Sequence, residues 1–206
     1  MAMAAPRPTV RELQRLVQEL IFPFYQIERH GELSFAGGRH ENDAEHSWSI
    51  ALFACALAPQ IDPKLDIGKV CQFATVHDVI EVYAGDTSNF ASEIKLATKE
   101  SREKSALRRL AKDYKALPWI TKTVEAYERQ GSDEARFVKS MDKVLVLLYD
   151  YVENGHFYQR NKITMEQWRS TLQKHREKAK VHSGAFLYYD EIWELLLANP
   201  QFFYPE

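Results

Sequence analysis

The stretch His77-Asp78-Val79-Ile80-Glu81 is the most informative feature of the sequence, because it places three ionisable side chains in a segment whose pattern is typical of a buried helix. In a helix each residue advances about 100° around the axis, so the histidine and the two acidic residues would fall within one arc. Their side chains would then converge on one point. This geometry predicts a site rather than a solvated helix face.

Two further ionisable residues share helical faces with apolar ones. Asp142 lies on a stripe with Val138 and Leu145, and His46 lies on a stripe with Ile50. Such stripes point into a core. A buried carboxylate either changes its protonation state or finds a cation, and a metal ion is the strongest cation available. We therefore expect these residues to meet at a metal.

Length and composition indicate one ordinary globular domain, which we place at residues 1–206. Apolar residues make up 45% and charged residues 27%, and no apolar run approaches the roughly 20 residues that a membrane span needs. A net charge of -2 without a long basic run gives no support for a nucleic-acid polymer as partner. The N-terminus lacks a secretory layout, and Cys55 and Cys71 lie in apolar stretches, so we expect a cytoplasmic protein without a membrane segment.

Helical periodicity runs from end to end, which predicts an all-α bundle with no strands. Segment 31–39 is expected to be a loop because of its glycines. The charged segment 92–115 is expected to be a solvated helix, with a substrate lid as the alternative. The expected helices are 9–20, 43–58, 66–84, 91–114, 118–129, 133–154, 164–181 and 187–198.

An early histidine, a His-Asp pair and a later aspartate in apolar surroundings resemble the HD-domain superfamily of metal-dependent phosphohydrolases. Segments 39–47 (RHENDAEHS), 77–86 (HDVIEVYAGD) and 132–142 (SDEARFVKSMD) more narrowly resemble the 5'-deoxynucleotidases, which remove phosphate from deoxyribonucleoside monophosphates. The resemblance spans about residues 24–153. It implies a single-domain HD-type helical bundle with a core at 24–155 and a C-terminal helical extension at 156–206.

The resemblance makes His46, His77, Asp78 and Asp142 the metal ligands. This nitrogen and oxygen set suits one divalent ion, namely Mn, Co, Fe, Zn or Mg. Related two-metal phosphodiesterases and two-iron oxygenases use further histidines between the His-Asp pair and the last aspartate. None occurs here between His77 and His156, so we expect a single metal ion.

Glu81 and Asp86 are the expected catalytic carboxylates. Glu81 lies one turn after His77 and is our first choice to orient or deprotonate the attacking water, with Asp86 near the substrate or the leaving oxygen. The alternative for Glu81 is that it orients a metal ligand. The resemblance supports both positions.

Three cations are expected to bind phosphate: Arg39, Arg29 and Lys139. The alternative for Arg39 is an ion pair with Glu41 or Glu45. Related enzymes place an aromatic residue after the arginine that corresponds to Arg29, whereas this chain has a histidine there. The alternative for Lys139 is that it balances the charge of buried carboxylates.

The C-terminal region carries further residues that invite a function. We expect His156, His175 and His182 to be solvated rather than metal ligands. The aromatic clusters at 188–189 and 202–204 should cover a core or a partner subunit, which makes a homodimer a hypothesis.

The sequence thus predicts a phosphohydrolase that cleaves a phosphate monoester with metal-activated water, and a small phosphorylated substrate, a (deoxy)ribonucleoside 5'-monophosphate, is favoured. One alternative is a hydrolase of another small phosphorylated metabolite. Another is a non-catalytic helical regulatory protein with a structural metal. Glu81, Asp86 and Arg39 argue against the last, because a structural site needs only its ligands.

Overall fold

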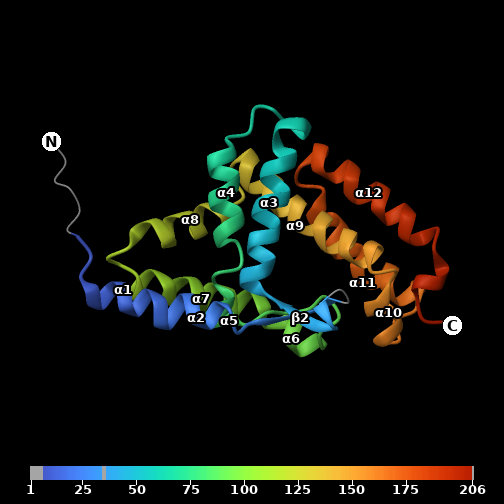
Figure 1. The fold of residues 1–206 in the computed structure, drawn as a ribbon, viewed down its shortest axis with the longest axis horizontal. Coiled ribbons are helices and arrows are strands. Elements are labelled where there is room, and N and C mark those ends of the chain that lie inside the picture. Colours follow the sequence, from blue (N-terminus) through green and yellow to red (C-terminus); the bar gives the residue numbers. More distant parts are fainter. Residues whose placement is uncertain (1–6, 34–35, 206) are drawn as a thin grey trace.

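The structure, a computed structural model, describes residues 7–33 and 36–205 and is almost entirely helical (Figure 1). The helices are α1 (Val10–Leu16), the π-helical η1 (Val17–Ile21), α2 (Phe22–Phe24), α3 (Asp43–Ile61), α4 (Ile67–Val76), α5 (Glu81–Ala84), α6 (Glu93–Ala97), α7 (Lys99–Asp113), α8 (Pro118–Glu128), α9 (Asp133–Val152), α10 (His156–Arg160), α11 (Met165–Ala179), α12 (Ser183–Leu197) and the 3₁₀ turn η3 (Pro200–Phe202). The predicted all-α fold class is confirmed. None of the described helices is both long and apolar enough to cross a bilayer.

One small hairpin interrupts the helices. Strand β1 (Glu28–Leu33) pairs antiparallel with β2 (Arg39–Asn42), with Leu33 opposite Arg39. The expectation that the chain has no strands was therefore wrong, as was the loop at 31–39 except in its turn; residues 34–35 lie outside the described residues. Strands this short and polar show no alternation of apolar residues, so their pairing has no sequence signal. Strand β2 leads directly into α3.

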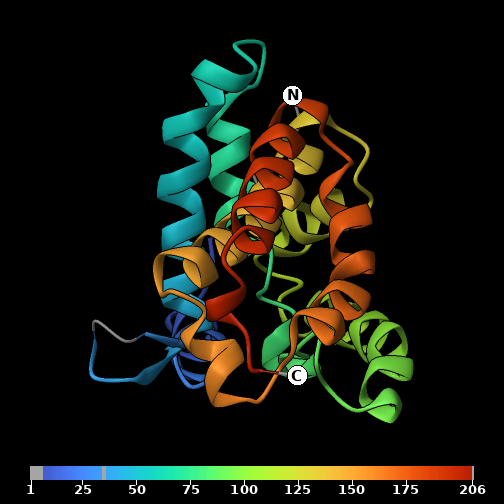
Figure 2. The same ribbon diagram turned by 90° about the vertical axis from the view of Figure 1, so that its right-hand side faces the viewer.

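Helix α9 is the centre of the molecule and packs against elements on two sides. The N-terminal helices, α7 and α8 lie at one end of the long axis and α10–α12 at the other, with α3, α4 and α9 between them (Figures 1 and 2). Two apolar clusters share α9 and a third lies under α7 and α8. Their central residues are Ile50, Val70 and Met141 for the first, Leu147, Trp168 and Trp193 for the second, and Val76, Leu110 and Val124 for the third.

The expected helix 66–84 is broken in the middle. Helix α4 ends at Val76, and α5 begins at Glu81. The His77 ring nitrogen Nδ1 lies 2.8 Å from the carbonyl oxygen of Ala74, which in a continued helix would accept from the next backbone N–H. A side chain thus replaces a helical hydrogen bond, and the backbone tightens, with Glu81 N donating to Asp78 O at 2.8 Å. His77 and Asp78 therefore lie in a turn rather than in a continuous helix, but their side chains still converge, with His77 Nε2 3.1 Å from Asp78 Oδ2.

The C-terminal helices are part of the core. His175 and His182 are buried, so the expectation that they are solvated was wrong, whereas His156 is exposed. Tyr189, Phe202 and Phe203 are buried within this chain. These three rings thus cover a core, which is one of the two outcomes expected, whereas Tyr188 and Tyr204 of the same clusters are exposed. The homodimer stays a prediction.

Candidate metal centre and substrate cavity

Three elements bring two histidines and an aspartate together. His46 from α3, His77 from the turn after α4 and Asp142 from α9 each offer a ligand atom within 4.8 Å of the others. His46 Nε2 lies 3.1 Å from Asp142 Oδ1, and the two imidazole ring centroids are 5.3 Å apart. All three residues are buried. Three of the predicted ligands therefore converge on one point.

The histidines present the ring atoms that a metal needs. His77 Nδ1 donates to a backbone carbonyl, which aims Nε2 into the site, where it is buried without a hydrogen-bond partner. His46 Nδ1 lies 3.3 Å from Glu41 Oε2, which orients its ring in the same way. Two imidazole Nε2 atoms and a carboxylate fit a divalent ion. Glu41 was not predicted to have this role.

Asp78, the fourth predicted ligand, belongs to an adjoining acidic group with Asp43 and Glu81. Its Oδ2 lies 3.1 Å from His77 Nε2, which joins the two groups. Arg29 from β1 donates to Asp78 Oδ2 at 2.8 Å and to Asp43 Oδ1 at 3.3 Å. The positive charge of the Arg29 guanidinium thus offsets part of the negative charge of this acidic group.

The carboxyl groups differ in charge state. Burial, together with neighbouring Asp78 and Asp43, raises the pKa of Glu81 to about 10. Burial likewise raises the pKa of Asp43 to about 7. Without a bound metal, Glu81 therefore holds a proton at neutral pH, and a nearby cation would favour its release.

Burial alone would raise the pKa values of Asp78 and Asp142, but their cationic neighbours overcome this effect. His77 and Arg29 hold the pKa of Asp78 below its usual range. Lys143, whose Nζ lies 2.6 Å from Asp142 Oδ2, holds the pKa of Asp142 well below its usual range. The predicted carboxylate ligands are therefore anionic, as metal binding requires.

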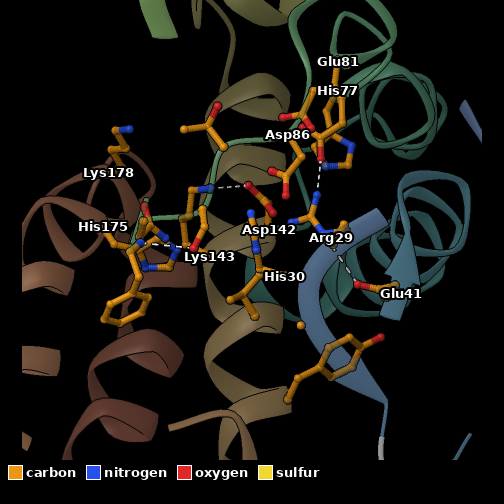
Figure 3. A pocket seen from close by; sticks show the side chains of 18 of the residues that line it. Arg29, His30, Glu41, His77, Glu81, Asp86, Asp142, Lys143, His175 and Lys178 are labelled. Carbon is orange, nitrogen blue, oxygen red and sulfur yellow. Dashed lines mark hydrogen bonds and ion pairs between the residues drawn. The ribbon is translucent and has the colours of Figure 1, made fainter. Parts of the chain in front are cut away.

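A cavity of about 240 Å³ opens onto this centre. His77, Glu81, Asp86 and Arg29 lie on one side of it, and Asp142 lies near the middle (Figure 3). Both predicted catalytic carboxylates thus line the same cavity as three of the predicted metal ligands, His77, Asp78 and Asp142.

The three predicted phosphate-binding cations have different places. Arg29 and Lys139 line the cavity. Arg39 does not line it; its guanidinium is half-exposed and binds Glu45 through two contacts of 2.7 Å. The structure thus shows the ion-pair alternative for Arg39.

Several residues of the site had no sequence signal that singled them out. Lys143 and His175 line the cavity, and Asp43 contacts Arg29. Glu41 and Asp43 shortly precede His46 in the same motif, and Lys143 directly follows the predicted ligand Asp142. Adjacency to a predicted ligand was therefore the only clue for these three residues, and His175 had none.

The fold and the site define a helical domain built around a buried histidine and aspartate centre. The family model described as HD domain matches residues 25–182, and the chain belongs to the HD-domain family. The matched residues include α11, whereas the resemblance of the sequence motifs spans only about residues 24–153.

Proteins with assigned names support this placement. The 5'-deoxynucleotidase HDDC2 of Bos taurus is 28% identical over 167 residues, which cover 75% of this chain and 78% of the bovine protein. The protein of that name from Homo sapiens is 30% identical over 115 residues, or 53% of each chain.

Solved structures share the fold. A protein of Magnetospirillum magnetotacticum described as a predicted metal-dependent phosphohydrolase superposes with a TM-score of 0.77 at 28% identity, covering 98% of this chain and 100% of that one. A conserved hypothetical protein of Pyrococcus furiosus has a TM-score of 0.56 at 24% identity, covering 92% of this chain and 99% of that one, and shows the likeness of fold alone.

Proposed function

We propose that this protein is a metal-dependent phosphohydrolase that cleaves a phosphate monoester, with a (deoxy)ribonucleoside 5'-monophosphate as substrate. The observation that carries the proposal is the buried centre of His46, His77 and Asp142, which opens into a cavity beside Glu81 and Asp86. Membership of the HD-domain family and the relatives named 5'-deoxynucleotidase support it.

One divalent ion, such as Mn²⁺, Co²⁺, Fe²⁺, Zn²⁺ or Mg²⁺, would be held by His46, His77, Asp78 and Asp142. When bound, it lowers the pKa of a water molecule and withdraws charge from a phosphate oxygen. The adjoining acidic group is already compensated by Arg29. This compensation supports a single metal ion rather than two.

Glu81 and Asp86 would move protons. In this proposal Glu81 orients the attacking water and accepts its proton, since its buried carboxyl lies beside the ligand Asp78. Asp86 lies on the same side of the cavity and would face the substrate or the leaving oxygen. Removing a general base of this kind lowers turnover by about 10²–10⁴-fold.

The substrate phosphate would be neutralised by Arg29 and Lys139, which both line the cavity. A phosphate monoester needs this help because its anionic oxygens repel the nucleophile. Val146, Phe90 and Phe157 also line the cavity, and the centroids of the two phenylalanine rings are 6.0 Å apart. Aromatic and apolar walls suit a nucleoside as the leaving group.

The test is phosphate release by the purified protein, loaded separately with each metal, across ribo- and deoxyribonucleoside monophosphates. We expect Glu81→Gln to keep its metal and lose about 10²–10⁴-fold in turnover, and Asp142→Asn to lose the metal. Glu166→Gln, which alters an exposed glutamate, is the matched control and should be fully active.

Two outcomes would contradict the proposal. Absence of phosphate release from every ester with every metal would remove the catalytic function. Loss of the bound metal in Glu81→Gln would instead assign Glu81 to positioning a ligand.

A further inference from the structure

Five consecutive residues, 86–90, line the cavity, and Asp86 is the first of them. This segment is neither helix nor strand, and it follows Gly85, whose φ of 73° takes the chain out of α5. Among the described residues, no hydrogen bond or ion pair holds the Asp86 side chain. The place of its carboxyl group in the cavity therefore depends on the backbone that carries it.

Arg102, a partly buried residue of α7, binds the chain on both sides of this segment. Its guanidinium donates to the carbonyl oxygens of Ala84 and Gly85, the latter at 3.3 Å. It also donates to Thr87 Oγ1 at 2.7 Å. Beyond the segment it donates to the carbonyl oxygen of Lys95 in α6 at 3.2 Å. One side chain thus joins the chain before the segment to the chain after it.

The chemistry of these contacts requires an arginine. The carbonyl groups at the end of a helix have no partner within it, and here an N–H group from another helix supplies one. A guanidinium carries five N–H donors in a planar fork, so it can serve four acceptors that lie in different directions. The ammonium group of a lysine donates from a single atom and could not span them.

We propose that Arg102 is a positioning residue for the reaction: it fixes the segment that carries Asp86 and so sets the place of that carboxyl group in the cavity. Arg102 does not line the cavity, so it acts through the segment and not on the substrate. This inference rests on the proposed function for the role of Asp86, but not for the ordering of the segment.

Arg102→Ala tests the proposal in the metal-loaded protein, assayed with the nucleoside monophosphate that the unaltered protein cleaves fastest. We expect kcat to fall about 10²-fold, which is the cost of misplacing a reacting group by about 1 Å. The affinity for the metal should not change, because the predicted ligands come from α3, from the turn after α4 and from α9, none of which Arg102 binds. Circular dichroism checks that the variant is folded.

Combining Arg102→Ala with Asp86→Asn separates positioning from a general loss of structure. Two residues that act as a unit have non-additive effects, so the double variant should be at most about threefold slower than Asp86→Asn alone. Three results would overturn the proposal: an additive loss in the double variant, an unchanged kcat in Arg102→Ala, or an unchanged kcat in Asp86→Asn.

Arg108→Ala is the matched control, because Arg108 lies on the same helix, is exposed, and donates within that helix to Ser105 Oγ at 3.0 Å. It should leave kcat unchanged. A loss of kcat equal to that of Arg102→Ala would show that any lost arginine charge on α7 has this effect, and would overturn the proposal.

Hydrogen exchange measures the ordering of the segment without any need for activity. The backbone N–H of Phe90 donates to Ser88 Oγ and that of Ala91 to Ser88 O, both at 3.1 Å. We expect these two amides to exchange about tenfold faster in Arg102→Ala, while the amides of α9 keep their rates. Unchanged exchange of Phe90 and Ala91 would overturn the proposal.

The outcome is separable from that of the proposed function. If the unaltered protein cleaves no phosphate ester but exchange is faster in Arg102→Ala, the phosphohydrolase function fails and the ordering of the segment by Arg102 stands. If esters are cleaved and the loss in the double variant is additive, the positioning role alone fails.

Discussion

Asp78 and Glu81 lie three residues apart, and their pKa values move in opposite directions. Arg29 and His77 stabilise the anion of Asp78, whereas Glu81 has burial and nearby carboxylates, which raise its pKa to about 10. When the pKa values of two neighbouring carboxyl groups shift in opposite directions, one group can stay anionic as a metal ligand while the other can hold and release a proton. Three-residue spacing alone could not distinguish these roles, because each depends on which side chain contacts the arginine.

The pH dependence of the protein's stability can be tested at Asp150, which is not one of the predicted metal ligands. Burial raises its pKa from 3.8 to about 7, although the Tyr158 hydroxyl, which donates to its carboxylate, opposes the rise. The folded protein thus keeps a proton that the unfolded chain releases near pH 4. The resulting stability is fully present below about pH 4 and is lost as pH rises through about 7.

Asp150→Asn removes this titration. We expect the stability of the unaltered protein, measured relative to the variant by urea unfolding at pH 4, 5, 6 and 7, to fall steadily across that range. A difference that is constant with pH would contradict the assignment.

At the scale of elements, the break between α4 and α5 shapes the site. A continuous helix would have kept His77, Asp78 and Glu81 on one arc, whereas the turn lets His77 face His46 while Asp78 faces Arg29. Periodicity does not show this break, because no proline or glycine marks residues 77–80. The break occurs where the His77 ring nitrogen Nδ1, instead of a backbone N–H, donates to the carbonyl oxygen of Ala74.

One buried hydroxyl bridges α9 to the end of α11 and the start of α12. Ser140 Oγ donates to Ala179 O at 2.8 Å and accepts from His182 N at 3.1 Å. Ser140→Ala leaves both backbone groups unpaired, so we expect a loss of about 1–3 kcal/mol in the free energy of unfolding. Chemical denaturation measures this loss.

Ser170→Ala is the comparison for that prediction, because its exposed hydroxyl bonds only within α11, to Gln167 O. It should change the stability by less than about 0.5 kcal/mol. Equal effects of the two substitutions would show that the Ser140 bridge does not hold the junction.

For the whole molecule, a metal ion would join segments far apart in the chain. The predicted ligands come from α3, from the turn after α4 and from α9. Because the unfolded chain does not hold them together, an ion at about 100 times its Kd stabilises the fold by about 2.7 kcal/mol. This corresponds to a rise in Tm of roughly 5–10 °C for a domain of this size.

Thermal unfolding with and without Mn²⁺, and after chelation, measures the rise. Asp142→Asn should abolish it, and Glu166→Gln should preserve it. An undiminished rise in Asp142→Asn would place the ion elsewhere on the protein.

Periodicity in the sequence predicted the helical class and the burial of His46 and Asp142, because it reports which face of a helix is buried and both residues lie on apolar stripes. The motifs indicated the family. Periodicity could not show that Arg29 lines the cavity and Arg39 does not, since this depends on the register of a hairpin.

The same holds for the four lysines that line the cavity, Lys99, Lys139, Lys143 and Lys178, which come from three helices. The physical reason is that burial of a face is a local property of a segment. Which faces meet depends on packing between distant segments, and that packing sets the distances, charges and pKa values of the site.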